Sequence, residues 1–185
     1  MQKQNHIPHL KSIHEFYRQL RIGTPQRTDF SIMRIEDQPK EKRLEMPLFR
    51  CDFYRLVFIR SKGVEWLLPE TQFESTDNCI YFSYPGKLES WKSNEKIEGY
   101  LVCFTKEFFQ TNHLLTTEFP FFTFEKSKLL ILDDTQAAYL AEQQEELLEE
   151  FKKDYPDTKD MLVALLSRYL ISVNRLFVIP VQPDI

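Results

Sequence analysis

Residues able to bind a ligand or do chemistry are few in this sequence, and they gather in aromatic stretches. Phe49, Cys51 and Phe53 alternate on one face of a predicted strand. Glu89 and Trp91 alternate in the same way after a Pro-Gly turn. A lining of this type is apolar with a few polar groups, which is typical of a small-molecule pocket. The predicted ligand-binding set is Phe49, Cys51, Phe53, Trp66, Phe82, Tyr84, Glu89 and Trp91.

A second interpretation is open for each of these side chains, namely that it fills the hydrophobic core and binds nothing. Glu89 favours the first interpretation, because a carboxylate among aromatic side chains is costly to bury without a partner. A bound ligand is one such partner. We therefore expect a pocket, with a completely filled interior as the alternative.

Motifs for catalysis and metal binding are missing from the sequence. There is no Gly-rich phosphate loop, no GxSxG and no HExxH. None of the four histidines falls in a predicted strand, and the possible carboxylate pairs are interpreted as solvated turn charges, with Glu89 as the exception. We therefore predict no catalytic residue, no metal and no cofactor. The histidines are His6, His9, His14 and His113, and the carboxylate pairs are Glu65 with Glu70 and Glu89 with Glu98.

Cysteine usage and charge limit the compartment and the partners. Cys51, Cys79 and Cys103 are odd in number and show no CxxC spacing, which disfavours a disulfide framework or a zinc site and favours a reducing cytoplasm. No run of 18 uncharged apolar residues is present, so we expect a soluble protein without a membrane partner. The net charge of −4 predicts that this chain alone binds DNA poorly.

The first half of the chain reads as a short helix followed by strands. Ser12 and Glu15 match a capping box, and Gly23 with Pro25 is expected to end the helix. Phe30 to Ile35 is a predicted strand and Glu36 to Pro47 a predicted loop. From Leu48 to Phe104 the pattern of short apolar runs and turns predicts consecutive antiparallel strands of a small sandwich or barrel.

The second half begins with a phenylalanine-rich segment and ends with two helices. Thr105 to Phe109 predicts a helical turn, and a loop or edge segment from Leu114 to Phe124 follows. Its phenylalanines are predicted to seal the end of the barrel. A helix capped by Asp133 or Asp134 comes next, and a second helix begins at Asp157 after the Tyr155-Pro156 break. The phenylalanines of that segment are Phe119, Phe121, Phe122 and Phe124.

The last helix is apolar on more than the single stripe that a surface helix needs. One face is expected to pack on its own domain and the other on a second copy of the chain. The alternative is a helix buried entirely inside one monomer. The predicted dimerisation residues are Leu162, Leu166, Tyr169 and Val173.

The order of motifs resembles the N-terminal sensor domain of AraC/XylS-type transcriptional regulators, most closely the group common in Bacteroidetes. The resemblance covers nearly the whole chain, and it depends on order and spacing rather than on one diagnostic motif. The motifs are Ile7-Pro-His-Leu-Lys-Ser-Ile-His-Glu-Phe16, Asp52-Phe-Tyr54, Tyr81-Phe-Ser-Tyr-Pro-Gly86 with Trp91, Gly99-Tyr-Leu-Val-Cys-Phe-Thr-Lys-Glu-Phe108 and Phe119-Pro-Phe-Phe122.

The resemblance implies a mainly β fold with helices. It would be a cupin-like double-stranded β-helix, or jelly-roll barrel, with a short N-terminal helix and a C-terminal antiparallel helix pair. Residues 1–132 would form the effector-binding barrel with an N-terminal arm, residues 133–179 the dimerisation helices, and residues 180–185 a tail toward a DNA-binding unit that this chain lacks. The chain would then be an excised sensor fragment or a free-standing relative.

The sequence departs from the family at the usual metal ligands. Where many relatives have a His-x-His-Asp-Phe-Tyr run, this chain has Phe49-Arg-Cys-Asp-Phe-Tyr54, and Glu89 replaces the histidine of Pro-Gly-x-x-His-x-Trp. The resemblance therefore implies a barrel without metal, and it makes metal-dependent oxygenase or isomerase chemistry doubtful.

Three functions fit these observations. The first is a cytoplasmic, non-enzymatic regulatory module: a small-molecule effector enters the barrel, the chain dimerises through its C-terminal helices, and DNA is bound only through a further C-terminal domain. The second is a free-standing metal-independent cupin, either a binding protein or a sugar isomerase/epimerase-like enzyme with Glu89 or Tyr84 as acid or base. The third is a structural dimer without a ligand. We expect the first.

Overall fold

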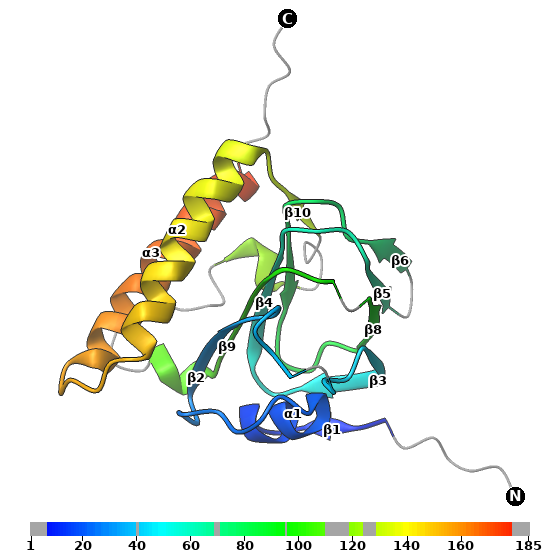
Figure 1. Cartoon of the computed structure of the whole chain (residues 1–185), viewed down its shortest axis with the longest axis horizontal. Helices are drawn as coiled ribbons and strands as arrows, with labels where there is room; N and C mark the ends of the chain where they lie inside the picture. Colours follow the sequence, from blue (N-terminus) through cyan, green and yellow to red (C-terminus); the bar gives the residue numbers. More distant parts are fainter. Residues whose placement is uncertain are drawn as a thin grey trace, which may run out of the picture.

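The computed structural model describes residues 7–39, 41–68, 71–94, 96–109, 119–123 and 129–178. In this described part of the chain, ten strands form two five-stranded sheets that face each other (Figure 1). The first, called the β3 sheet, has the strand order β1 (His9–Leu10), β3 (Glu45–Cys51), β8 (Glu89–Ser93), β5 (Val64–Leu68) and β6 (Thr71–Glu74). The second, called the β4 sheet, has the order β10 (Leu130–Ile131), β7 (Cys79–Ser83), β4 (Tyr54–Ile59), β9 (Gly99–Phe104) and β2 (Phe30–Arg34).

The connections between strands define a jelly roll. From β2 to β9 the chain passes from one sheet to the other at every connection except the β5–β6 hairpin. This winding, with β3-β8-β5-β6 facing β2-β9-β4-β7, is the double-stranded β-helix of cupin-like folds. The predicted fold class, mainly β with a cupin-like barrel and added helices, is confirmed.

The strands of the β4 sheet are buried on both faces. Along β4, Arg55, Val57 and Ile59 face the barrel interior, whereas the side chains of Leu56 and Phe58 belong to the core beneath the C-terminal helices. A sheet covered on both faces has continuous apolar strands instead of an alternating pattern. The predicted strand 30–35 ends at Arg34, close to the expected position.

Helix α1 (Ile13–Leu20) closes one end of the barrel (Figure 1). The Ser12 hydroxyl accepts from the amide of Glu15 at 3.2 Å, as the capping box predicts, but the Glu15 carboxylate accepts from the amide of Lys11 instead of Ser12. The helix ends before the expected Gly23. Its C-cap is Arg21, whose left-handed backbone (φ 60°) lets its amide donate to the carbonyl of Arg18.

The expected loop over 36–47 ends earlier than predicted. Strand β3 already begins at Glu45 and includes Pro47. The pairing with β8 shifts register between Met46 and Phe49, so one extra residue is accommodated in a bulge. Proline is tolerated in strands at such bulges, because its missing N–H is not needed for the ladder.

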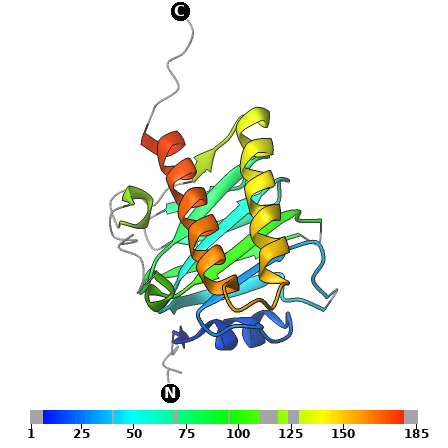
Figure 2. The ribbon, with the colours of Figure 1, turned by 90° about the vertical axis from the view of Figure 1, so that its left-hand side faces the viewer.

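Two antiparallel helices cover the outer face of the β4 sheet (Figure 2). Helix α2 (Asp134–Phe151) has Asp133 as its N-cap, with a complete capping box to Gln136. Helix α3 is Thr158–Val178. Both helices share one hydrophobic core with the sheet. The predicted division at residue 132 stays a prediction, and the predicted tail 180–185 lies outside the described residues.

The four predicted dimerisation residues face the chain's own core. Leu162, Leu166, Tyr169 and Val173 are all fully buried in the single chain, and the Tyr169 hydroxyl accepts from Gln144 Nε2 at 2.6 Å. These side chains are therefore not on the surface of one protomer. The outward side of α3 presents Met161 and Ile171 instead, with 48% and 38% of their surface exposed.

The phenylalanine-rich segment lies beside α3, not at the end of the barrel. One 3₁₀ turn, η1 (Lys106–Phe109), precedes the segment, and another, η3 (Pro120–Phe122), lies within it. Phe121 stacks on Phe82 with ring centroids 4.5 Å apart, and Phe122 meets Tyr54 edge to face at 4.8 Å. The expectation that these rings seal the barrel end is wrong, because they fill the layer between the sheet and the helix. Leu114 and Phe124 lie outside the described residues.

The first residue of β9 has to be glycine, because no side chain fits there. Gly99 has φ 147°, and a Cβ there would lie 1.9 Å from the carbonyl oxygen of Phe58. We expect Gly99→Ala to lower the free energy of unfolding by more than about 2 kcal/mol, because the strand must shift. Gly86→Ala is the matched control: its φ is 84°, but no heavy atom lies within 4 Å of the added Cβ. Its expected cost is about 1 kcal/mol. Equal losses in urea unfolding would contradict this prediction.

Candidate functional site

A cavity of about 100 Å³ lies inside the barrel between the two sheets. Helix α1 and the residues Ile35, Gln38, Lys42 and Arg43 complete its wall. Most of the lining is apolar, as expected for a small-molecule site. The apolar residues are Phe16, Leu20, Ile22, Met33, Ile35, Val57, Ile59, Val64, Trp66, Trp91, Ile97 and Leu101, and the polar ones are Gln38, Lys42, Arg43, Arg55, Tyr81 and Ser93.

Both tryptophans of the chain line this cavity. Trp66 on β5 and Trp91 on β8 are direct partners in the strand register. The sequence contains no other tryptophan. Tryptophan emission of the protein therefore comes from two side chains in the cavity wall.

The structure places two of the eight predicted ligand-binding residues, Trp66 and Trp91, in the cavity wall. Phe49, Cys51 and Phe53 are buried together with α1 in a neighbouring core. The other three, Phe82, Tyr84 and Glu89, do not line the cavity: Phe82 and Tyr84 belong to the core beneath α2 and α3, and Glu89 is buried in an ion pair. A role of these residues in ligand binding stays a prediction.

Glu89 has a protein partner. Its carboxylate, with no exposed surface, forms an ion pair with Arg55 of β4, which is 3% exposed. Ser83 Oγ donates to Glu89 at 3.1 Å and accepts from Arg55 Nη2 at 2.9 Å, and the Tyr81 hydroxyl also donates to the carboxylate. The sequence did not single out Arg55. It lies two residues before Val57, and alternate residues of a strand point to the same face, so both face the barrel interior.

Aromatic rings surround the Arg55 guanidinium. Its central carbon lies 4.9 Å from the ring centroid of Phe16 on α1 and 5.0 Å from that of Phe49 on β3. The charged group thus connects β4, β8, β3 and α1. Burial raises the pKa of Tyr81 well above its usual range, so its hydroxyl remains a neutral donor to Glu89.

The cysteines inside the barrel are not reactive groups. Burial raises the pKa of Cys51, and raises that of Cys103 well above the ordinary value, with Arg55 acting in the opposite direction on both. Thiols in this state are poor nucleophiles and poor metal ligands. Within the described ranges, no three His, Cys, Asp or Glu side chains are grouped so that they could hold a metal ion. His6, His113 and Glu70 lie outside these ranges.

Lys87 is a second buried cation, in the turn before β8. Its Nζ donates to the carbonyl of Phe82 at 2.9 Å and lies 4.4 Å from the ring centroid of Tyr81. Burial, and to a lesser extent the nearby charge of Arg55, lowers the pKa of Lys87 to about 7. The amine therefore titrates near neutral pH.

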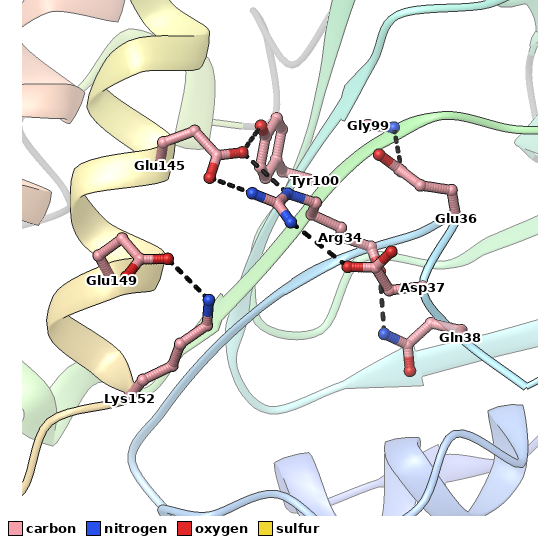
Figure 3. A network of polar contacts seen from close by, with 9 residues as sticks. All are labelled: Arg34, Glu36, Asp37, Gln38, Gly99, Tyr100, Glu145, Glu149 and Lys152. Atoms are coloured by element: carbon pink, nitrogen blue, oxygen red, sulfur yellow. Dashed lines mark hydrogen bonds and ion pairs between the residues drawn. The ribbon is translucent and has the colours of Figure 1, made fainter.

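A polar network connects the cavity wall to α2 (Figure 3). Gln38, which lines the cavity, donates to the carbonyl of Arg34 at 2.9 Å. The Arg34 side chain binds Glu145 of α2 through both of its nitrogens Nε and Nη2, and the hydroxyl of Tyr100 donates to the same carboxylate. Arg34 is also the main cause of the lowered pKa of Glu145. Asp37 lies 3.6 Å from Arg34 Nη1.

Comparison with known proteins shows likeness only at the level of structure. No family model matches the sequence, and no curated protein matches it. The apo form of a ToxT variant from Vibrio cholerae has a TM-score of 0.52 and 15% identity over 83% of this chain and 58% of that chain. At this identity the likeness shows a shared fold.

Two further solved structures align less well. The AraC-like transcriptional activator CuxR has a TM-score of 0.47 and 14% identity over 72% of this chain and 44% of that chain. A cupin-2 domain protein from Shewanella frigidimarina has a TM-score of 0.31 and 8% identity over 40% of this chain and 66% of that chain. The present chain thus spans 44% of CuxR and 58% of the ToxT chain.

In the described part of the chain no helix has the length and apolar character needed to cross a membrane.

The buried ion pair generates a prediction about stability. Glu89→Gln leaves the Arg55 charge buried without a counter-charge, and Arg55→Met does the same to Glu89. Each change is expected to lower the free energy of unfolding by about 3–5 kcal/mol, whereas the double variant Arg55→Met/Glu89→Gln loses less than the sum of the two single losses. Glu149→Gln, at the exposed pair with Lys152, is the control and changes it by less than about 0.5 kcal/mol.

Urea unfolding of the four variants measures these differences. If a single variant does not fold, the double variant still decides the question, because it folds only when the loss comes from an unpaired charge. A loss of less than about 1 kcal/mol in Glu89→Gln would contradict the role given to this pair.

Lys87 generates a prediction about pH. Its pKa is about 7 in the folded chain and about 10.5 when unfolded, so the unfolded chain binds more protons between these values. Stability from this group therefore rises with pH above 7, by at most about 1.4 kcal/mol per pH unit. The comparison of wild type with Lys87→Met in urea unfolding from pH 6 to 8.5 isolates it. The variant is expected to lack the rise, and parallel curves would overturn the assignment.

Proposed function

We propose that this chain is the effector-sensing and dimerisation part of an AraC-type transcription regulator, with a small molecule bound in the barrel cavity. The single observation that carries the proposal is the cavity, which both sheets and α1 enclose and which the Gln38–Arg34–Glu145 network joins to α2. The order of sequence motifs and the fold shared with ToxT support it. A non-enzymatic role in the cytoplasm is part of the proposal.

We expect the proposed site to bind its ligand without metal and without acid-base catalysis. No Asp or Glu of the described residues lines the cavity. Glu89 is paired with Arg55 beside the cavity, and its oxygens accept from Tyr81 and Ser83. A carboxylate held in this way is a poor general base. This arrangement favours binding over turnover, and with it the regulator over the sugar isomerase/epimerase alternative.

The signal would travel from the cavity to the helices. A ligand beside Gln38 changes the position of the segment 35–38, and this segment is bonded to Arg34 and through it to Glu145. Such coupling requires that the ligand bind two arrangements of the helices with different affinity. The dimer contact is proposed on the outward side of the helix pair. It would include Tyr139 of α2 and Met161 and Ile171 of α3, whose side chains are all exposed. DNA would be bound by a further domain after α3.

A reporter fusion tests the proposal in one experiment. The chain is joined through its C-terminus to a DNA-binding domain that represses only as a dimer, and a panel of sugars, organic acids, amines and neutral aromatics is added. We expect at least one compound to change reporter output several-fold. Val57→Phe, which fills the cavity, is expected to abolish the response, and Ile131→Phe on the exposed surface to retain it.

Two measurements on the purified chain complete the test. Analytical ultracentrifugation is expected to show a dimer, and tryptophan fluorescence is expected to change with the compound that alters reporter output. A strictly monomeric chain at about 100 μM, at which any dimer with a dissociation constant of micromolar order is populated, would contradict the dimerisation part. A response that survives Val57→Phe would contradict the cavity as the effector site.

A further inference from the structure

We propose that the ligand of this cavity is a small apolar carboxylate, whose charge is bound by Lys42 and Arg43 and whose apolar body lies against Trp66 and Trp91. The inference rests on the proposed function, namely that the cavity receives an effector. It adds the chemical class of that effector. The arguments are the charge of the wall, the position of the two cations, the unpaired donor of Arg55 and the size of the space.

The charged side chains of the cavity wall are all positive. Lys42, Arg43 and Arg55 line the cavity, and no Asp or Glu among the described residues does. Glu89 neutralises Arg55, but Lys42 and Arg43 have no carboxylate within ion-pair distance in the described part of the chain. An excess of two positive charges at an apolar cavity favours an anion there.

The protein offers Lys42 and Arg43 only weak hydrogen-bond partners. Lys42 Nζ donates to the carbonyl of Ile35 at 3.4 Å, and Arg43 Nη1 approaches the sulfur of Met46 at 3.6 Å. Both residues are half-buried, so water satisfies them less fully than it would on an open surface. A carboxylate is the natural partner, because charge-assisted hydrogen bonds are stronger than these contacts.

The backbone holds this pair of cations at the cavity. The amide of Arg43 donates to the carbonyl of Leu20 in α1 at 2.8 Å, and the amide of Lys42 donates to that of Pro39 at 3.0 Å. On the other side, the Ser93 amide of β8 donates to the carbonyl of Leu44 at 2.7 Å. These bonds fix the backbone of Lys42 and Arg43, so ligand binding has to order only their side chains.

The Arg55 guanidinium offers a further donor in the wall. Its Nε is buried and has no hydrogen-bond partner. A buried donor left in this state costs free energy that a ligand oxygen would recover. The inferred class therefore includes carboxylates with a hydroxyl or keto oxygen on the apolar body. Because Glu89 already balances Arg55, this donor selects an oxygen and not a second negative charge.

The size of the space limits the apolar body. The cavity of about 100 Å³ is smaller than the engineered cavity of about 150 Å³ that takes up benzene. A short branched chain fits inside, and a single ring fits only when part of it extends toward Lys42 and Arg43. Sugars and other polyols are disfavoured, because the apolar wall offers few partners for their hydroxyl groups.

A charge series of matched compounds tests the inference by tryptophan fluorescence and calorimetry on the whole chain. The carboxylates are benzoate and 3-methylbutanoate, the neutral analogues are benzamide and 3-methylbutanamide, and the cation is benzylamine. Each carboxylate is expected to bind at least about tenfold more tightly than its amide, and benzylamine is expected not to bind. Both tryptophans report on the site because both line the cavity.

Charge-neutralising variants locate the head group. Lys42→Gln and Arg43→Gln are each expected to weaken carboxylate binding about tenfold and to leave amide binding unchanged. Lys62→Gln is the control, because this lysine is exposed and lies outside the cavity. Thermal unfolding of each variant without ligand confirms that the fold is intact.

The outcomes separate this inference from the proposed function. Amides that bind as tightly as carboxylates, or carboxylate binding that is unchanged in the Lys42→Gln/Arg43→Gln double variant, would overturn the inference and leave the cavity as an effector site. No binding by the series, while another compound of the reporter panel acts through the cavity, would overturn only the ligand class. No response to any compound in either assay would overturn both.

Discussion

The ion pair between Arg55 and Glu89 is the interaction on which the rest of the barrel depends. It joins β4 of one sheet to β8 of the other inside the jelly roll. Two buried charges are tolerated only with complete partners, and Tyr81 and Ser83 of β7 supply the remaining hydrogen bonds. Phe16 lies against the same guanidinium, so the docking of α1 depends on it as well. The pair is electrically neutral, and the excess charge of the cavity therefore lies with the segment that carries Lys42.

The β4 sheet borders the cavity on one face and supports the C-terminal helices on the other, because successive side chains of a strand point to opposite faces. Side chains at the positions of Val57 and Leu101 face the cavity, whereas those of Leu56 and Val102 support the helices. Each strand thus contacts both the ligand space and the helix layer. A change at the cavity can reach α2 through the sheet only if the packed core moves, and packed cores resist small deformations. The polar route at the sheet edge, through Arg34, avoids that resistance.

The sequence allowed the class of fold, the strand-rich middle, the N-cap at Ser12 and both long helices to be predicted, because turns, caps and periodicity are local signals. The site was predicted less well. Strands buried on both faces have no alternating pattern, so Phe82 was assigned to the cavity although it faces the helices. The partner of Glu89 lies on another strand, which only the fold brings close. Lys42 fell in a predicted loop, and nothing local shows that this loop lines the barrel.

The two charged contacts of the barrel differ in strength, and that difference suits a sensor. The buried pair Arg55–Glu89 is costly to separate, because each charge is almost fully buried and would lose its ion-pair partner. Arg34 and Glu145 are each about one third exposed, so water screens this pair more than it screens the buried one, although the contact is bidentate. Rearranging it therefore costs less than separating Arg55 from Glu89. In the proposed sensor, the buried pair would preserve the shape of the cavity while the half-exposed pair rearranges with the helices.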